Sequence, residues 1–106
     1  MYYKNAGVHV DNIIHYRLKL FVAGDTLRAR TAIANLTHIC DEAFPGSYEL
    51  AIFDVLRQPD IAEQEKILAT PTLVKETPLP LRRIIGDLSD KVKVLAALSL
   101  ETHAHI

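Results

Sequence analysis

A Thr-Pro pair, Thr70-Pro71, stands directly before the apolar run 72–74. Before proline the cis peptide bond costs only about 0.5–1 kcal/mol, against about 3 kcal/mol elsewhere, so proline is the residue at which a small α/β domain adopts it. We predict a cis bond here, leading into a central strand and facing the loop 22–28. A redox protein with a cis proline of this kind carries its reactive thiol in the loop that faces the proline. The loop 22–28 contains no cysteine, so that thiol is missing here. The pattern therefore favours binding over redox catalysis.

The length and charge of the chain exclude several classes of protein. A chain of 106 residues forms one domain, and its 49% hydrophobic content is ample for a core. The net charge of −1 gives no electrostatic reason to bind nucleic acid or a membrane surface. The apolar runs are too short to span a bilayer, and no signal peptide is recognisable, so we predict a cytoplasmic protein. We expect a flexible leader at 1–14, one domain at 15–101 and a short tail at 102–106.

Hydrophobic periodicity predicts seven elements in this domain. Alternating apolar residues indicate a strand at 15–22, and three- and four-residue spacing indicates a helix at 27–44 capped by Asp25 or Thr26. A second strand at 48–55 precedes a short helix at 60–66 started by Pro59. Two strands at 72–75 and 82–85 and a helix at 90–100 capped by Ser89 complete the domain. This order, βαβαββα, is that of an α/β protein with a thioredoxin-like fold.

The C-terminal half carries mixed local signals. Residues 91–95 alternate like a strand, yet they also begin a plausible helix. The preceding connection holds Pro78 and Pro80, and a peptide bond before proline can adopt two isomers. We predict that these prolines act as elements of a conformational switch; the alternative is that they stiffen a hairpin loop. Chains with such mixed signals can support two packings that differ by a few kcal/mol.

Four segments of the chain resemble the KaiB family of the cyanobacterial circadian clock. They are LKLFVAGDT (18–26), DVL (54–56), KILATPTL (66–73) and RRIIGDL (82–88), and the resemblance covers about residues 16–98. It implies a protein with two folds from one sequence. One is a tetramer with element order βαββααβ, and the other is a thioredoxin-like monomer that binds the ATPase ring KaiC. Pro71 joins Pro78 and Pro80 among the positions at which we expect the switch.

The resemblance also implies a function without catalysis or cofactor. We predict a regulatory protein that binds a KaiC-type ATPase and modulates its phosphorylation and ATPase cycle, in circadian or stress-related timing. KaiA or a SasA-type histidine kinase are further implied partners, and a homotetramer or homodimer is implied for the free protein. Alternatives are a stress-response adaptor with another ATPase partner, or a thioredoxin-like enzyme that uses Cys40. The enzyme is disfavoured because Cys40 lies near the C-terminal end of its helix, whereas a helix N-terminus lowers a thiol pKa.

Two departures from the family's usual sequence concern the last helix. Clock members typically have Gly and Asp where this chain has Ala97 and Ser99. Ala favours a helix over Gly by roughly 1 kcal/mol, and losing a negative charge near the helix C-terminus adds about 0.3–1 kcal/mol. We therefore predict that the thioredoxin-like form is well populated without KaiC.

Basic residues within the matching segments are the candidate contacts with KaiC. A solvated strand or helix face is the alternative explanation for each of them. Asp54 ends a strand, and a lone acid is more plausible as a turn acceptor than as a catalytic group. No His pair has the spacing of a zinc site, so we predict no metal, including at His103 and His105. The predicted partner-binding residues are Lys19, Lys66, Lys75, Arg82 and Arg83.

Overall fold

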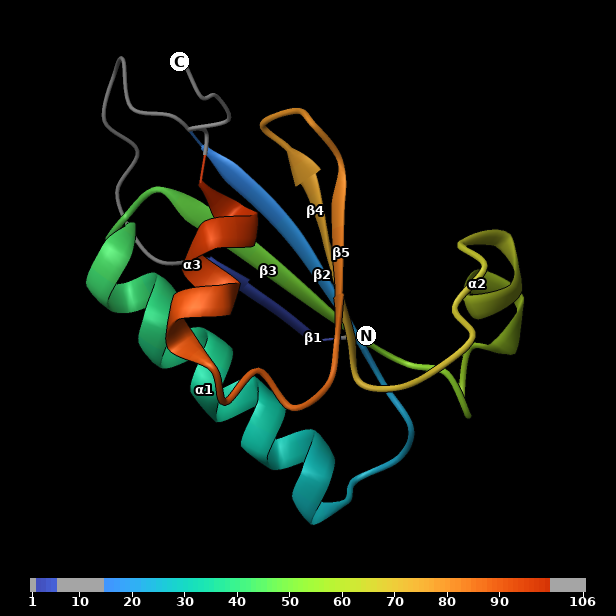
Figure 1. Ribbon diagram of the computed structural model, residues 1–106. Coiled ribbons are helices and arrows are strands. Elements are labelled where there is room, and N and C mark those ends of the chain that lie inside the picture. Colours follow the sequence, from blue (N-terminus) through green and yellow to red (C-terminus); the bar gives the residue numbers. More distant parts are fainter. Residues whose placement is uncertain (1, 6–14, 100–106) are drawn as a thin grey trace.

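The computed structural model describes residues 2–5 and 15–99, and these form eight elements (Figure 1). From the second element onward, their order is the predicted βαβαββα. The elements are β1 (Tyr2–Asn5), β2 (Tyr16–Val22), α1 (Leu27–Ala43), β3 (Tyr48–Asp54), α2 (Pro59–Gln64), β4 (Thr72–Thr77), β5 (Arg82–Ile85) and α3 (Lys91–Leu98).

The strands form one mixed sheet in the order β1-β3-β2-β4-β5. Strands β2 and β3 are parallel, with α1 as their crossover, whereas β4 is antiparallel to β2 and β5 is antiparallel to β4. Helices α1 and α3 cover one face of the sheet, and α2 lies on the other side (Figure 1). We call these the α1/α3 face and the α2 face.

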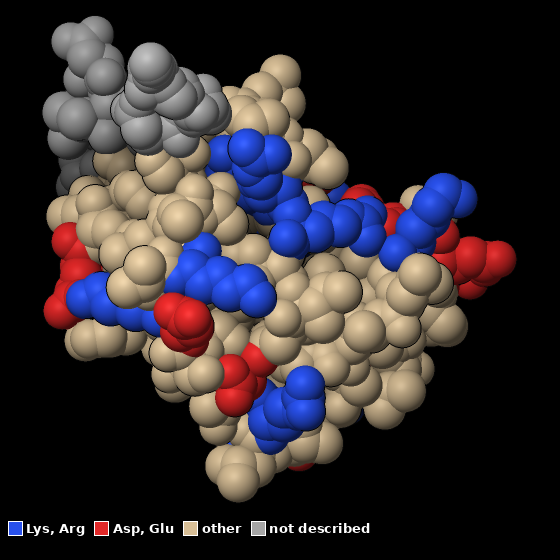
Figure 2. All heavy atoms as spheres, in the orientation of Figure 1, with Lys and Arg blue, Asp and Glu red and all other residues tan. Residues whose placement is uncertain are grey.

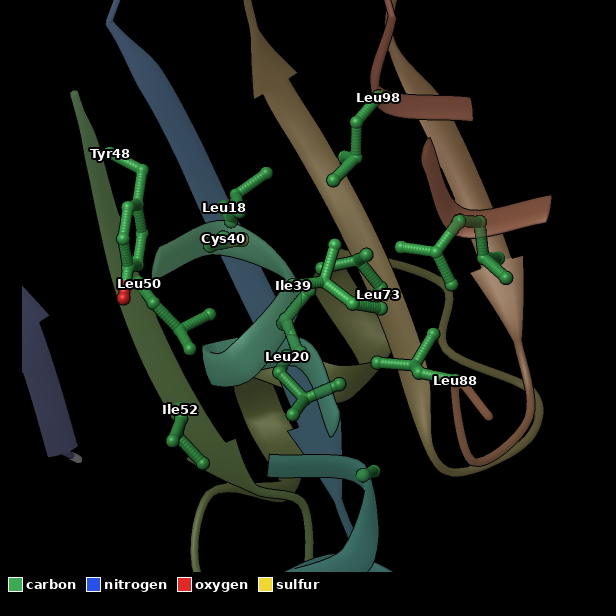
Figure 3. Close-up of a cluster of buried hydrophobic side chains, with 14 of the residues drawn as sticks. Leu18, Leu20, Ile39, Cys40, Tyr48, Leu50, Ile52, Leu73, Leu88 and Leu98 are labelled. Atoms are coloured by element: carbon green, nitrogen blue, oxygen red, sulfur yellow. The ribbon is translucent and has the colours of Figure 1, made fainter. Parts of the chain in front are cut away.

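The alternation in β2 distributes its side chains between the two faces. Leu18 and Leu20 point into the larger core beneath α1 and α3, which also contains Leu36, Leu73 and other apolar residues (Figure 3). Phe21 points to the α2 face, in a smaller cluster. Burying each of these large side chains stabilises the fold by roughly 1.5–3 kcal/mol, so the larger core supplies most of the apolar stabilisation. The smaller cluster consists of Phe21, Ala51, Phe53 and Val74, with Val55, Ile61 and Ile67 packed against it.

The residues that begin α1 and α2 are those predicted from the sequence, whereas the cap of α3 is a different residue. The Thr26 hydroxyl accepts a hydrogen bond from the Ala29 amide at 3.1 Å, and Pro59 occupies the first turn of α2. The predicted cap of α3, Ser89, is wrong. Asp90 is the cap, because its carboxylate accepts from the Lys93 amide at 3.1 Å.

The predicted cis bond at Thr70-Pro71 is confirmed. Pro71 and Thr70 line a cavity of about 300 Å³ together with Ala23 and Thr26, so the proline faces the loop 22–28 as expected. The bonds Thr77-Pro78 and Leu79-Pro80 in the β4–β5 connection are also cis.

The structure differs from the sequence prediction at several ends. Strand β1, which the sequence analysis did not predict, pairs antiparallel with β3 from within the expected leader; residues 6–14 lie outside the described part. Strand β4 continues to Thr77, and α2 ends at Gln64. The ambiguous residues 91–95 are helical. Periodicity locates an element's centre better than its ends, because pairing partners decide where a strand stops.

Candidate functional site

Lys66 and Arg83 lie together at the end of α2. The Lys66 backbone has φ +57°, in the left-handed region that disfavours side chains by roughly 1–2 kcal/mol. The Arg83 guanidinium offsets this backbone cost with two hydrogen bonds. It donates to the Lys66 carbonyl oxygen at 3.0 Å and to the Glu65 carbonyl oxygen. The Lys66 side chain itself is exposed. The Arg83 guanidinium therefore holds the backbone that presents Lys66.

Lys19 joins the same face from β2. Its Nζ lies 2.8 Å from a Glu65 carboxylate oxygen and 2.6 Å from one of Glu76, and 6.0 Å from the centroid of the Phe53 ring. Burial alone lowers the pKa of the Lys19 ammonium, but the hydrogen bonds to Glu65 and Glu76 outweigh it and raise that pKa above its usual value. Lys19 thus links β2, β4 and the end of α2 through paired charges.

Arg82 and Lys75 lie on the opposite face. They are cross-strand partners, and the adjacent pair is Val74 and Arg83. Val74 packs in the smaller cluster on the α2 face. Because successive residues of a strand point to opposite faces, Lys75 and Arg82 point to the α1/α3 face. Arg82 is exposed, but the Lys75 side chain is only 1% exposed. Lys75 is therefore not the surface residue that the sequence analysis assumed. The structure brings Lys19, Lys66 and Arg83 together and separates Arg82 and Lys75 from them.

An apolar rim adjoins this basic group. Leu68 is 94% exposed and lines a groove of about 320 Å³ between α2 and the segment before Pro71. Leu56, at the end of β3, is also exposed, at 70%. Sequence reasoning missed these leucines because apolar residues predict burial, and only the fold shows that nothing among the described residues covers them. In Figure 2, Lys and Arg side chains form a band that runs from β5 toward α2.

We define the KILA surface as the exposed side chains of Lys66 and Leu68 with the groove that Leu68 lines. It combines one exposed positive charge with apolar area. Such a mixture suits a protein partner, because aromatic and aliphatic anchors inside a polar rim are typical of interfaces.

Asp54, the last residue of β3, accepts hydrogen bonds from the turn that follows β3 and from the loop that follows β2. Its Oδ1 accepts from the Gly24 amide at 2.9 Å and from the Leu56 amide at 3.0 Å. These two backbone hydrogen bonds lower the pKa of the Asp54 carboxyl. Gly24 has φ +74°, which glycine adopts without strain. The turn-acceptor interpretation of Asp54 is thus confirmed.

Cys40 has none of the properties of a nucleophile. It is fully buried in the larger core, and burial raises the pKa of its thiol to about 12. The thiolate is the reactive form, and it is essentially absent at neutral pH. Cys40 is a packing residue, and the enzyme alternative loses its catalytic group.

The described residues contain neither a metal-ligand cluster nor a membrane-spanning helix. No group of three or more His, Cys, Asp or Glu side chains there is arranged to hold a metal ion. No helix there is long and apolar enough to cross a membrane. His103 and His105 lie outside the described residues.

The predicted switch positions are spread over three parts of the fold. Pro71 precedes β4, Pro78 and Pro80 occupy the β4–β5 connection, and Ala97 and Ser99 lie at the end of α3, where Ser99 is the C-cap. They therefore flank every element that follows α2. Their role in switching stays a prediction.

Comparison with known proteins decides the family. The model of the KaiB domain matches residues 19–100. The chain belongs to the KaiB family. The circadian clock oscillator protein KaiB of Synechococcus elongatus is 55% identical over 85 residues, which are 80% of this chain and 83% of that protein. The KaiB proteins of Prochlorococcus marinus and Microcystis aeruginosa are 55% and 54% identical over the same share of this chain, covering 81% and 82% of their own lengths.

Solved structures show the same fold. The N-terminal domain of Synechococcus elongatus SasA is 21% identical, with a TM-score of 0.69 over 96% of this chain and 100% of that domain. Mitochondrial thioredoxin 3 of Saccharomyces cerevisiae is 24% identical, with a TM-score of 0.62 over 78% of this chain and 76% of that protein. The predicted thioredoxin-like α/β fold is confirmed.

KaiB family membership also confirms the predicted class of function. The protein is a non-enzymatic clock protein of the KaiB type. The motif KILATPTL that carried the resemblance supplies both the cis proline and the exposed Lys66 and Leu68. One family segment thus builds part of the core and part of the surface.

Proposed function

We propose that this protein binds a KaiC-type ATPase ring and modulates its phosphorylation and ATPase cycle. Membership of the family of circadian clock oscillator proteins supports this proposal. The observation that carries it to particular residues is the KILA surface: a Leu68 side chain 94% exposed beside the Lys66 charge. Leu68 continues into a groove lined by apolar side chains such as Val55 and Ile67, and a contiguous apolar patch rimmed by polar residues is typical of a protein–protein contact.

The polar contacts around the KILA surface suggest how it is kept ready for a partner. Arg83 bonds the backbone at Glu65 and Lys66, and Lys19 holds the Glu65 carboxylate. A surface already in its bound shape loses less conformational entropy on association. We therefore assign Lys66 to direct contact, and Arg83 and Lys19 to positioning. Arg82 belongs to another face, and Lys75 is not part of the proposed contact.

A pull-down with the KaiC-type protein of the same cell, with and without ATP hydrolysis, tests the proposal. The unaltered protein is expected to be retained by KaiC, and Lys66→Ala and Leu68→Ala are expected to weaken binding tenfold or more. Lys93→Ala is the matched control, because Lys93 is an exposed lysine on α3, across the sheet. No retention by any KaiC of that cell would contradict the proposal, and equal losses for Lys66 and Lys93 would contradict the assigned surface.

Further partners and the assembly state follow from the same proposal. We infer that the KaiC-bound form recruits KaiA or excludes a SasA-type histidine kinase, and that the free protein forms a tetramer or dimer in the cytoplasm. If the oligomer uses a different packing of the chain, dilution favours the thioredoxin-like monomer by mass action. Sedimentation at several concentrations checks this, and a single species with one unchanging NMR spectrum would contradict it.

A further inference from the structure

Lys75 is a lysine inside an apolar core. Its side chain is 1% exposed, and it ranks by size among the fully buried side chains, beside Leu18 and Leu73. Within the described ranges its Nζ has no hydrogen-bond partner and forms no ion pair. A buried ammonium without a partner costs far more free energy than a buried neutral group.

The cross-strand partner of Lys75 adds electrostatic repulsion to the cost of burial. Arg82, the cross-strand partner of Lys75 on β5, is also a cation. Burial first, and then repulsion from Arg82, lower the pKa of the Lys75 ammonium. Its partner on β2 is Leu18, which is apolar.

No described carboxylate on this side of the sheet compensates. The two acids near the end of α1 are already engaged, since Asp41 accepts from the Tyr48 hydroxyl and Glu42 pairs with Lys91. The titratable side chains within the larger core are Tyr16 of β2, Cys40 of α1 and Tyr48 of β3, and Arg82 of β5 is the charged cross-strand partner.

We propose that Lys75 is a charge switch built into the fold: its protonated form disfavours the thioredoxin-like packing, and loss of the proton favours it. The packing buries the ammonium, whereas any state that exposes Lys75 leaves it solvated. The equilibrium between the two kinds of state then responds to the charge at this one position. This inference does not depend on KaiC, so it can fail or succeed separately from the proposed function.

The direction with pH follows from linkage. The pKa of Lys75 is lowered in the fold, so states that expose Lys75 bind the proton more tightly. Between the lowered pKa and the ordinary value near 10.5, the ratio of folded to unfolded protein rises with pH, by up to tenfold per pH unit. Below the lowered pKa the whole penalty is present and constant.

Urea unfolding of the full chain at several pH values between 7 and 10 tests the proposal. Lys75→Met is expected to raise the folded-to-unfolded ratio at pH 7 by tenfold or more and to remove the rise with pH. Tyr16 and Cys40, whose raised pKa values act in the opposite sense at high pH, are present in both proteins and cancel in the difference. Lys93→Met is the control, and it should leave both quantities unchanged.

A titration of the unaltered protein makes the test independent of any variant. The NMR signals of the lysine side-chain carbons report each pKa directly. Lys75 is expected to titrate below Lys93 in the same spectra. Equal midpoints for the two lysines, or a Lys75→Met protein less stable than the unaltered one, would overturn the proposal.

Discussion

Two lysines on neighbouring strands have opposite surroundings. Lys19 of β2 lies on the α2 face and contacts two carboxylates, whereas Lys75 of β4 lies on the α1/α3 face and contacts none among the described residues. Each follows an apolar residue of its strand, Leu18 before Lys19 and Val74 before Lys75. The strand alternation therefore sets only which face a lysine joins, and the elements packed on that face decide whether its charge stabilises or destabilises the fold.

The two faces are stabilised by different interactions. Apolar burial dominates the α1/α3 face, where α1 and α3 seal a continuous core. On the α2 face a smaller apolar cluster is supplemented by the charges of Lys19, Glu65 and Glu76. We expect the first face to respond to lost volume and the second to lost charge.

The largest expected effect comes from a cavity beneath α1. Leu36→Ala removes a fully buried side chain from the larger core and should lower the free energy of unfolding by about 3–5 kcal/mol. Ile61→Ala, at a partly buried position of the smaller cluster, should cost about 1–2 kcal/mol. Urea denaturation measures both, and equal losses would show that the two faces do not differ in this way.

A smaller effect is expected from Lys19→Met, and its sign is opposite to that of Lys75→Met. Removing the ammonium leaves Glu65 and Glu76 to repel each other, and the partly buried site should cost about 1–2 kcal/mol. Because the pKa of Lys19 is raised, its contribution is fully present below the ordinary value of 10.5 and is lost only as the pH rises from that value through the raised pKa. Adding Glu76→Gln should restore part of the stability. Stabilisation by Lys19→Met would contradict the comparison.

The double change Ala97→Gly with Ser99→Asp should weaken α3 by roughly 1–2 kcal/mol in total. The ratio of the helical form to the alternative form should then fall by about five- to thirtyfold, in favour of the proposed tetramer. Chemical shifts of Lys91–Leu98 and sedimentation measure the two consequences. An unchanged helix and an unchanged oligomer would show that these positions do not set the balance.

Removing the cap of α3 should lower the free energy of unfolding by about 1 kcal/mol. Asp90→Ala removes the carboxylate that accepts from the Lys93 amide and should lower the stability by that amount. Ser89→Ala leaves this cap in place and should cost less. Thermal unfolding of the two variants decides between them, and a larger loss at Ser89 would restore the sequence-based assignment.

The smallest effect is confined to acidic conditions. Asp54→Asn weakens the two hydrogen bonds from the Gly24 and Leu56 amides, so the variant should be less stable than the unaltered protein at pH 6. The pKa of Asp54 is lowered in the fold, so the stability that it supplies is present above about pH 4 and declines as the pH falls below that value. The melting temperatures of the two proteins should therefore approach each other as the pH falls below about 4, and a constant difference would argue against a role of the charge.

Local signals predicted much of this structure and failed where distant residues intervene. The apolar spacing of Leu27–Ala43 and the Thr70-Pro71 pair were sufficient for a helix and a cis bond. The sequence analysis treated five residues as one basic group: Lys19, Lys66, Lys75, Arg82 and Arg83. The register of β4 against β5 divides them, because one step along a strand moves a side chain to the other face.

The family, the order of the elements from β2 onward and the cis proline were all readable from the sequence, since each depends on neighbouring residues or on a short motif. Which lysine is paired, which is buried and which is exposed became visible only in the folded chain. Burial and charge pairing are properties of what packs against a residue, and those partners lie 46 positions away for Lys19 and Glu65. The exposure of Leu68 likewise depends on the fold, because no element among the described residues covers it.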